Sequence, residues 1–390
     1  MTYAVIAMER AMKIQEVILR AMSGALTWPQ AADILGMHPR SLRRWRARQQ
    51  RVGYDGLLDR RRQRPSPRLA PFAEIERILR LYRERYAGFN VRHFHQLVRR
   101  DEHVTLSYTL VKTALQKAGL VAKRRARGRH RRRREPRPCF GELLHLDGSR
   151  HQWLALVPEL WLTMIVIVDD ATKQVLYAEL RDGGESVAAI MIALRVVLER
   201  HGLPMALYTD RAHWAAHTPT AGGAVDRRHP TQVGRALARL GIEHILGYSP
   251  QARGRSERAN RTLQGRLVNE FRLAGITTVA AANRYLRDRF LPGFNAEFAR
   301  PPADPASAFV PLAGADLDQI LCVEEERVVG RDNVVTTARV PLQVAKQPGR
   351  RTCAGLRVLV RRHLNGQHSV WHGTRCLGRY DRAGHPLRAA

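Results

Sequence analysis

The sequence predicts a mixed α/β core that follows two all-α units and precedes a small β-barrel. Residues 141–250 alternate strand-like and helix-like segments, with three strand patterns before the first helix, as is typical of an α/β layer fold with a mixed sheet. Earlier in the chain, apolar residues recur at helical spacing. Later, short strand patterns alternate with turns, and Asn365-Gly366 indicates a tight hairpin.

The chain of 390 residues is too long for one ordinary domain. Two Arg-rich segments, the first also rich in Pro, cannot build a core and are interpreted as linkers. The expected boundaries are 1–59 and 72–122 for the helical units, 60–71 and 123–137 for the basic linkers, 138–299 for the α/β core, 300–317 for a further linker and 318–390 for the barrel.

The first helical unit has the pattern of a helix-turn-helix. Thr27 is placed to cap its second helix, which Gly36 ends. A third helix from about Ser41 turns Leu42 and Trp45 inward. Five arginines on this helix are left for solvent or phosphate: Arg40, Arg43, Arg44, Arg46 and Arg48. Three short helices with a tight turn before a basic third one are typical of DNA-binding units, although any three-helix bundle with a charged face would share the pattern.

The second helical unit is expected to be winged-helix-like. Ser107 can cap a helix that ends at Gly119. The outer side of that helix would carry the candidate DNA contacts Thr109, Lys112 and Thr113.

The charge balance restricts the class of partner. Lys and Arg total 66 against 35 Asp and Glu, a formal net charge of +31, which predicts a polyanionic partner. Nucleic acid is favoured over a membrane surface or a ribosome-like structural role, because the basic residues accompany helix-turn-helix patterns. No C-x-x-C pair supports a zinc or redox motif. No apolar run approaches the roughly 18 residues of a membrane span, so we expect a cytoplasmic protein without a membrane partner.

Three carboxylates stand where a divalent-metal site could form. Asp147 lies in or at the end of an apolar strand, where a charge is costly unless it is paired or bound to metal. Asp210 directly follows the strand 206–209, and sites in α/β folds gather at such strand ends. Glu257 begins a helix, a position that the helix dipole alone also favours. Two hard cations held by carboxylate oxygens assist the cleavage of a phosphodiester.

Other acidic residues have simpler interpretations. Asp169 and Asp170 are the alternative metal ligands, but they end a strand before Ala-Thr-Lys and are interpreted as turn formers. Asp182 and Glu185 flank Gly-Gly and are expected to cap a helix at 185–200. No G-x-x-x-x-G-K-[ST] motif occurs, so ATP-driven chemistry is not expected of this chain.

The ordered acidic motifs resemble those of the DDE transposases and retroviral-type integrases. His145-Leu146-Asp147 is similar to their first acidic strand and Tyr208-Thr209-Asp210 to their second. Residues 256–263, Ser-Glu-Arg-Ala-Asn-Arg-Thr-Leu, resemble the E-R-x-N-R-T-L helix of bacterial insertion-sequence transposases, among which the ISNCY-type group is nearest. The resemblance covers residues 10–380.

The sequence departs from that family pattern in two places. Asp210 and Glu257 are further apart than is typical of integrases, and an insertion at 212–232 accounts for the difference. Arg211 stands where relatives usually carry a small or polar residue.

The resemblance implies a ribonuclease-H-like catalytic core that cleaves element ends and transfers them into target DNA. Asp147 would bridge two Mg²⁺ ions, for which Mn²⁺ can substitute, while Asp210 and Glu257 would each complete one site. Three side chains near Glu257 would contact the DNA backbone: Arg258, Arg261 and Gln264. The expected partners are double-stranded DNA, at the terminal inverted repeats and in the target, and at least one further copy of the chain, because two ends must be brought together. The expected location is the bacterial nucleoid.

Two alternatives remain open at this point. A non-catalytic helix-turn-helix protein or decayed transposase relic would keep the charge and the helical units without convergent carboxylates. A ribonuclease-H-like nuclease would cut without joining.

Overall fold

The computed structural model describes residues 5–58, 70–123, 135–218, 225–226, 228–247 and 256–387. It divides into two compact units, Met1–Arg77 and Ile78–Ala390, and each is considered by itself. Most of the two expected basic linkers, at 60–71 and 123–137, lies outside the described residues. So do the loop directly before Glu257 and part of the expected insertion at 212–232.

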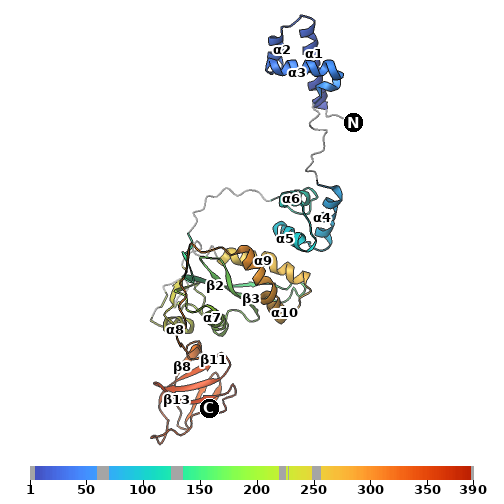
Figure 1. The fold of residues 1–390 in the computed structure, drawn as a ribbon. Helices are drawn as coiled ribbons and strands as arrows, with labels where there is room; N and C mark the ends of the chain where they lie inside the picture. The colour runs from blue at the N-terminus through green and yellow to red at the C-terminus, as the bar shows by residue number, and fades with distance from the viewer. Residues whose placement is uncertain are drawn as a thin grey trace. The chain divides into compact units, whose positions relative to one another are not determined.

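The first unit is a three-helix domain. It contains α1 (Val5–Met22), α2 (Trp28–Ile34), α3 (Pro39–Val52) and a short 3-10 helix (Gly53–Leu57) (Figure 1). Thr27 caps α2 as expected, in a reciprocal capping box with Gln30. Ala31 and Leu42 are buried against the inner face of α1, which confirms the amphipathic helices expected from the sequence.

A second group of three helices follows. It consists of α4 (Phe72–Glu84), α5 (Val91–Asp101) and α6 (Tyr108–Lys117). Its core is rich in aromatic contacts: Tyr82 and Tyr86 both contact Phe94 edge to face, with ring centroids 5.0 and 5.4 Å apart. Ser107 caps α6 as expected. The described residues 70–123 contain no strand, so no wing is seen among them.

A five-stranded mixed sheet forms the centre of the second unit. Its strands are β2 (Leu143–His151), β3 (Leu162–Asp169), β4 (Val175–Arg181), β5 (Ala206–Thr209) and β6 (Glu243–Leu246). They are ordered β4-β3-β2-β5-β6, with β2, β3 and β4 antiparallel and with β5 and β6 parallel to β2. The mixed α/β class expected from the sequence is therefore confirmed.

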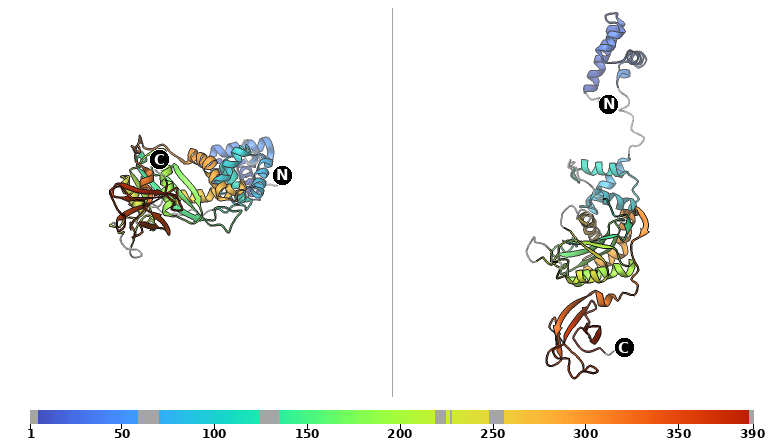
Figure 2. Two further views of the ribbon diagram at one scale, coloured as in Figure 1. Left: turned by 90° about the horizontal axis from the view of Figure 1, so that it is seen from below. Right: turned by 90° about the vertical axis from the view of Figure 1, so that its left-hand side faces the viewer.

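Helices cover both faces of this sheet (Figures 1 and 2). One face packs against α7 (Val187–His201) and α8 (Gln232–Arg239). The other packs against α9 (Ser256–Leu273), α10 (Val279–Tyr285), a π-helical segment (Leu286–Phe290) and α11 (Leu291–Phe298). Every residue of β3 is buried as a result, which explains its continuous apolar sequence.

Further strands lie outside the five-stranded sheet, most of them in the C-terminal region. The short strands β1 (Cys139–Phe140) and β7 (Asp304–Ser307) pair in parallel, and α12 (Leu317–Ile320) precedes the last strands. A four-stranded antiparallel sheet is formed by β8 (Cys322–Val328), β11 (Arg357–His363), β12 (His368–His372) and β13 (Arg375–Tyr380). A separate hairpin consists of β9 (Val334–Thr337) and β10 (Val340–Gln343).

The hairpin expected at Asn365-Gly366 joins β11 to β12, with Gly366 at a φ of 88° that glycine adopts readily. The sheet and the β9–β10 hairpin are not joined into a closed barrel by strand pairing among the described residues. No described helix has the length and apolar character needed to cross a membrane.

Candidate active site

Asp147 lies on β2, and Asp210 directly follows the neighbouring strand β5. In the parallel pairing of β2 with β5, His145 lies opposite Tyr208, and two residues further along each chain come Asp147 and Asp210. Side chains on alternate residues of a strand share a face, and neighbouring strands lie about 4.8 Å apart. If the register is extended one residue beyond the end of β5, Asp210 comes opposite Asp147 on the same face of the sheet.

Helix α9 lies against this same face. The Asn260 side chain donates from Nδ2 to Asp147 Oδ2 at 2.9 Å, and Gln264 Nε2 donates to Ser149 Oγ at 2.7 Å. Glu257 lies three residues before Asn260, one helical turn earlier, and its side chain is exposed. The start of α9 is thus fixed beside Asp147, with Glu257 at its solvent end.

The three carboxylates do not form one ligand cluster in this conformation. Among the residues that the structure describes, no three His, Cys, Asp or Glu side chains are grouped so that they could hold a metal ion. The carboxylates of Asp147 and Asp210 are hard oxygen ligands of the kind that Mg²⁺ prefers. Glu257 is exposed in the first turn of α9, and residues 248–255, which precede that turn, are outside the described part.

The turn after β5 is shaped by Asp210 itself. Its Oδ1 accepts a hydrogen bond from the backbone nitrogen of Ala212 at 2.8 Å. Four residues after Asp210, the Trp214 ring is fully buried, and its Nε1 donates to Glu185 Oε2 at 2.7 Å.

Glu185 has a role that the sequence did not indicate. The N-cap of α7 is Ser186, not Asp182 or Glu185, so the expected capping role was wrong. Instead, the Glu185 carboxylate lies directly over Gly148, where an added Cβ would stand 1.8 Å from Oε1. Glycine within a strand marks a close approach of this kind, and Gly148 directly after Asp147 was the signal in the sequence that could have found it.

Asp169 and Asp170 have structural partners, as their interpretation as turn formers requires. Asp169 accepts hydrogen bonds from the Gly141 nitrogen at 3.0 Å and from the nitrogen and hydroxyl of Thr172, both at 2.7 Å. Burial outweighs these bonds and raises the pKa of the Asp169 carboxyl. Asp170 Oδ1 lies 2.8 Å from Nε2 of the buried His145. These contacts hold the β3–β4 turn against β2.

The basic side chains on α3 are not equivalent. Of the five arginines expected to contact DNA, four are exposed: Arg40, Arg43, Arg44 and Arg48. Arg46 is half-buried, and its guanidinium lies 4.9 Å from the centroid of the Trp28 ring, a cation–π contact that ties it to α2.

The side chains expected to contact DNA from α6 and α9 also differ among themselves. On α6, Thr109, Lys112 and Thr113 are exposed, although the Thr113 hydroxyl donates to its own helix backbone. On α9, Arg258 and Arg261 are exposed. Gln264 is half-buried, and its bond to Ser149 attaches α9 to β2.

The chain is similar to known proteins over most of its length. Residues 15–73 match a family model described as winged helix-turn helix. The transposase y4bF of Sinorhizobium fredii is 31% identical over 370 residues, which cover 94% of this chain and 79% of that protein. The transposase for insertion sequence IS1202 of Streptococcus pneumoniae is 29% identical over 317 residues, or 72% of this chain and 67% of the relative.

A solved structure was also matched. One chain in a cryo-electron microscopy structure of a simian T-cell lymphotropic virus intasome in complex with PP2A regulatory subunit B56 gamma is 14% identical, covering 77% of this chain and 95% of that one. The TM-score of 0.31 is too low to carry an argument about the fold.

A helix-turn-helix match in the N-terminal unit and similarity to transposases over most of the chain define a protein of the DNA-rearranging class. The extent of the sequence identity decides the family: this chain belongs to the insertion-sequence transposases.

Proposed function

We propose that this transposase is a metal-dependent DNA strand transferase whose catalytic residues are Asp147, Asp210 and Glu257. The observation that supports this proposal most directly is the hydrogen bond from Asn260 to Asp147. This bond holds the helix that carries Glu257 against the face of β2 that carries Asp147, and Asp210 directly follows the neighbouring strand β5. The bond supports a site to which three carboxylates that lie far apart in the chain would contribute.

The fold supports the proposal in a second way. The sheet has three antiparallel strands followed by two parallel ones, with helices on both faces, and this arrangement supports the proposal of a ribonuclease-H-like core. A DDE transposase has its first acidic residue on a strand and its second at the end of a neighbouring strand, as Asp147 and Asp210 are here.

The reaction requires charge stabilisation more than covalent chemistry by the protein. Asp147 and Asp210 would hold Mg²⁺ between them, and Glu257 would complete the ligand set. Bound there, the ions would activate the attacking oxygen and stabilise the leaving one. Asn260 orients the Asp147 carboxylate, and the α9–β2 bonds keep that carboxylate at a fixed distance from the helix. Such positioning is the main contribution that a protein makes to phosphoryl transfer.

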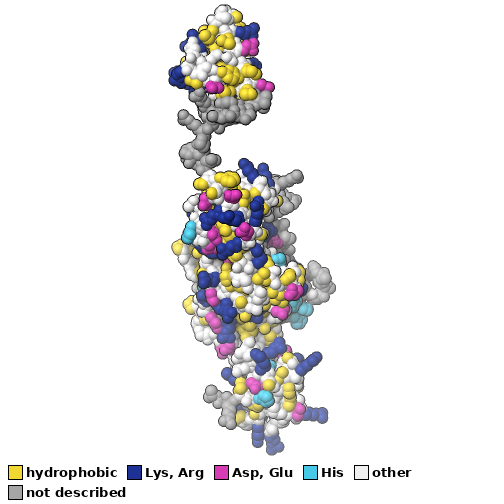
Figure 3. All heavy atoms as spheres, turned by 90° about the vertical axis from the view of Figure 1, so that its right-hand side faces the viewer, with side chains coloured by type: hydrophobic (Ala, Val, Ile, Leu, Met, Phe, Trp, Pro, Cys, Tyr) yellow, Lys and Arg dark blue, Asp and Glu magenta, His cyan; other side chains and the backbone are white. Residues whose placement is uncertain are grey.

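DNA would be held by the basic side chains outside this site. The exposed arginines of α3 and the exposed face of α6 would contact the terminal repeats, with Arg258 and Arg261 on the backbone near the cut. Lys and Arg side chains are spread over the face of the molecule drawn in Figure 3, in keeping with the net charge of +31. Phosphate contacts of this kind position the protein, and base contacts supply specificity.

The test is a cleavage assay on DNA that carries the element ends. Asp147→Ala and Glu257→Ala should each abolish Mg²⁺-dependent cleavage while end binding stays nearly intact. Asp288→Asn, which changes an exposed carboxylate in the same unit, should cleave normally. Full cleavage by Glu257→Ala would remove Glu257 from the proposed site. A strand-transfer assay on precut ends then separates a transposase from a nuclease that only cuts.

A further inference from the structure

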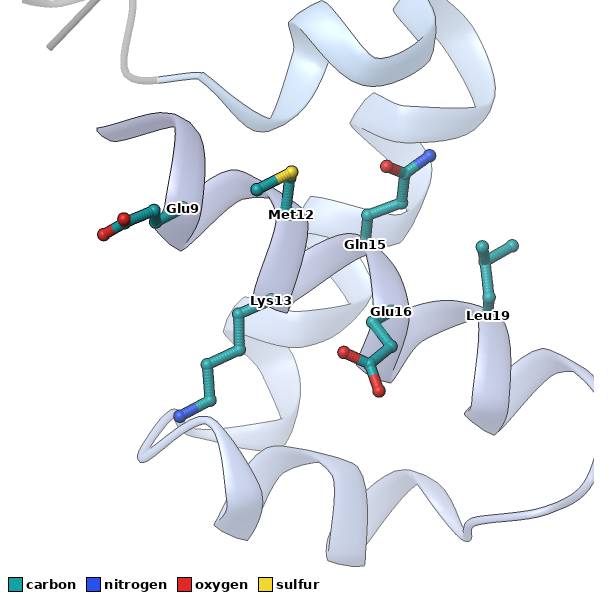
Figure 4. Close-up of a pocket in the computed structure, with 6 residues that line it drawn as sticks. All are labelled: Glu9, Met12, Lys13, Gln15, Glu16 and Leu19. Carbon is teal, nitrogen blue, oxygen red and sulfur yellow. The ribbon is translucent and has the colours of Figure 1, made fainter. Parts of the chain in front are cut away.

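Helix α1 has a second apolar edge that its own domain does not cover. Met8, Met12, Leu19 and Met22 are 41%, 54%, 51% and 49% exposed, whereas the opposite side of the helix supplies the buried core of the domain. With Gln15, these residues form what we call the α1 seam. Figure 4 shows Met12, Gln15 and Leu19 along one edge of the helix. A surface helix of a globular protein normally has one apolar stripe, and that stripe faces the core of its own domain.

The spacing of the seam is that of a helix-pairing surface. Its members follow one another at intervals of four, three, four and three residues, the heptad pattern by which two helices pack side by side. Gln15 occupies the central position of the five. A single polar residue in such a seam fixes register at some cost in stability.

The charges beside the seam identify the partner. Along one flank, Glu9, Lys13, Glu16 and Arg20 alternate in sign, and all four side chains are exposed. A second α1 laid antiparallel would bring Glu9 opposite Arg20 of the other copy and Lys13 opposite Glu16. In a parallel arrangement, residues of like charge would lie at the same level. The flank is therefore complementary to itself only about a two-fold axis perpendicular to the helix, an arrangement that gives an isologous dimer contact.

We propose that the α1 seam is a self-association surface on which a second copy of this chain packs antiparallel, with the two-fold axis near the middle of α1. Within the helix, Arg20 and Glu16 form an ion pair at 3.7 Å that is open to solvent, with side chains 59% and 68% exposed. An exposed ion pair of this kind adds little to the stability of the fold. The two side chains can therefore leave each other and pair with those of a second copy at little cost in free energy.

The contact should be weak without DNA. An α-helix of 18 residues is about 27 Å long, and one helix pair of that length buries less than the roughly 1,000 Å² of a stable interface. Two copies held near each other on DNA would associate far more readily, because the effective concentration is raised. The contact goes beyond the proposed catalytic function, which requires that two DNA ends meet but does not say which surface joins the subunits.

The first experiment measures self-association of the full chain without DNA by sedimentation equilibrium over a range of concentrations. Met12→Glu combined with Leu19→Glu should weaken dimerisation at least tenfold. Met205→Glu, at a residue 57% exposed in the other unit, should leave it unchanged. Helix content measured by circular dichroism should be the same in all three proteins, since every replaced side chain is exposed. A wild-type chain that stays monomeric at all concentrations, or a seam variant that dimerises normally, would overturn the proposal.

A second experiment tests the antiparallel order of charges. Glu9→Lys alone should weaken dimerisation, because it places a positive charge opposite Arg20 of the other copy. Adding Arg20→Glu in the same chain should restore dimerisation to near the wild-type level, since each pair then again joins opposite charges. Failure of the second change to rescue the first would exclude the antiparallel arrangement. Neither experiment measures DNA cleavage. Failure of the dimer proposal would therefore be distinguishable from failure of the catalytic proposal.

Discussion

Gly148→Ala is the sharpest test of how the sheet is supported behind Asp147. The new Cβ would stand 1.8, 2.4 and 2.8 Å from Oε1, Cδ and Cγ of Glu185. The whole end of that side chain would have to move, and not only its tip. Once it moves, Glu185 loses the hydrogen bond from Trp214 Nε1, now 2.7 Å long.

The size of the effect follows from the burial of Trp214. Its side chain is only 1% exposed, so the indole N–H would be left without water, at a cost of about 1–3 kcal/mol. Alanine is better than glycine within a strand by about 0.5–1 kcal/mol, and Gly148 has no positive φ that would oppose the change. The expected net loss in the free energy of unfolding is therefore about 1–2 kcal/mol.

A double-mutant cycle with Glu185→Ala isolates the contact. Urea unfolding of the two single variants and the double variant gives their stabilities, and Gly148→Ala should stabilise the protein by about 0.5–1 kcal/mol once Glu185 is absent. DNA cleavage should fall in Gly148→Ala as well, because Trp214 fixes the segment that follows Asp210. An equal loss of stability in both backgrounds would mean that the new methyl group disturbs something other than Glu185.

Three further predictions concern other buried charges. Burial lowers the pKa of His244 to about 4. As pH drops from about 6.5 to 4, the unfolded chain therefore binds the proton before the folded chain does, and the free energy of unfolding should fall. Urea unfolding at a series of pH values should show that His244→Gln removes up to about 3 kcal/mol of this fall. Burial raises the pKa of Glu270, but hydrogen bonds from His93 and Tyr285 outweigh it and hold the pKa below its usual value. Glu270→Gln should therefore lower the free energy of unfolding at neutral pH by about 1–3 kcal/mol. The difference between the variant and the wild type should narrow as pH falls below 4.5. A difference that does not change with pH would contradict the proposed role of the ionised carboxylate. Glu324 forms ion pairs with Arg235, Arg239 and Arg361 and so anchors the C-terminal sheet to the α/β core. Glu324→Gln should lower the free energy of unfolding by about 3 kcal/mol and speed proteolysis between the core and the sheet. An unchanged rate of proteolysis would argue against this anchoring role.

The elements that could be predicted from the sequence are those specified by local chemistry. The caps at Thr27 and Ser107 were predicted because a hydroxyl satisfies the free N–H groups of the next helical turn. The turn at Asn365-Gly366 was predicted because glycine tolerates a positive φ. Each of these signals lies within a few residues of the element that it specifies.

The site could be predicted only in part, because its geometry depends on contacts between distant segments. Asn260 and Asp147 are 113 residues apart in the chain, and no local pattern states that they meet. Glu185 was assigned to a cap because it stands near a helix start, whereas its actual partner, Trp214, is 29 residues away. Gln264 was placed toward DNA from helical periodicity alone, which does not show that Ser149 of β2 faces it.

Helix α9 links the proposed catalytic residue Glu257 to the second helical unit. Near its C-terminal end, α9 holds the segment before α5: Asn90 donates to the Gly265 carbonyl at 3.1 Å, and Arg272 donates to the Ala87 carbonyl at 2.7 Å. The buried His93 lies 2.7 Å from Glu270 of the same helix. Glu257 and the helices that end in α6 are therefore attached to one rigid element. A DNA segment bound by α6 would have its position relative to Glu257 set by this helix, whose register against β2 is fixed by Asn260 and Gln264.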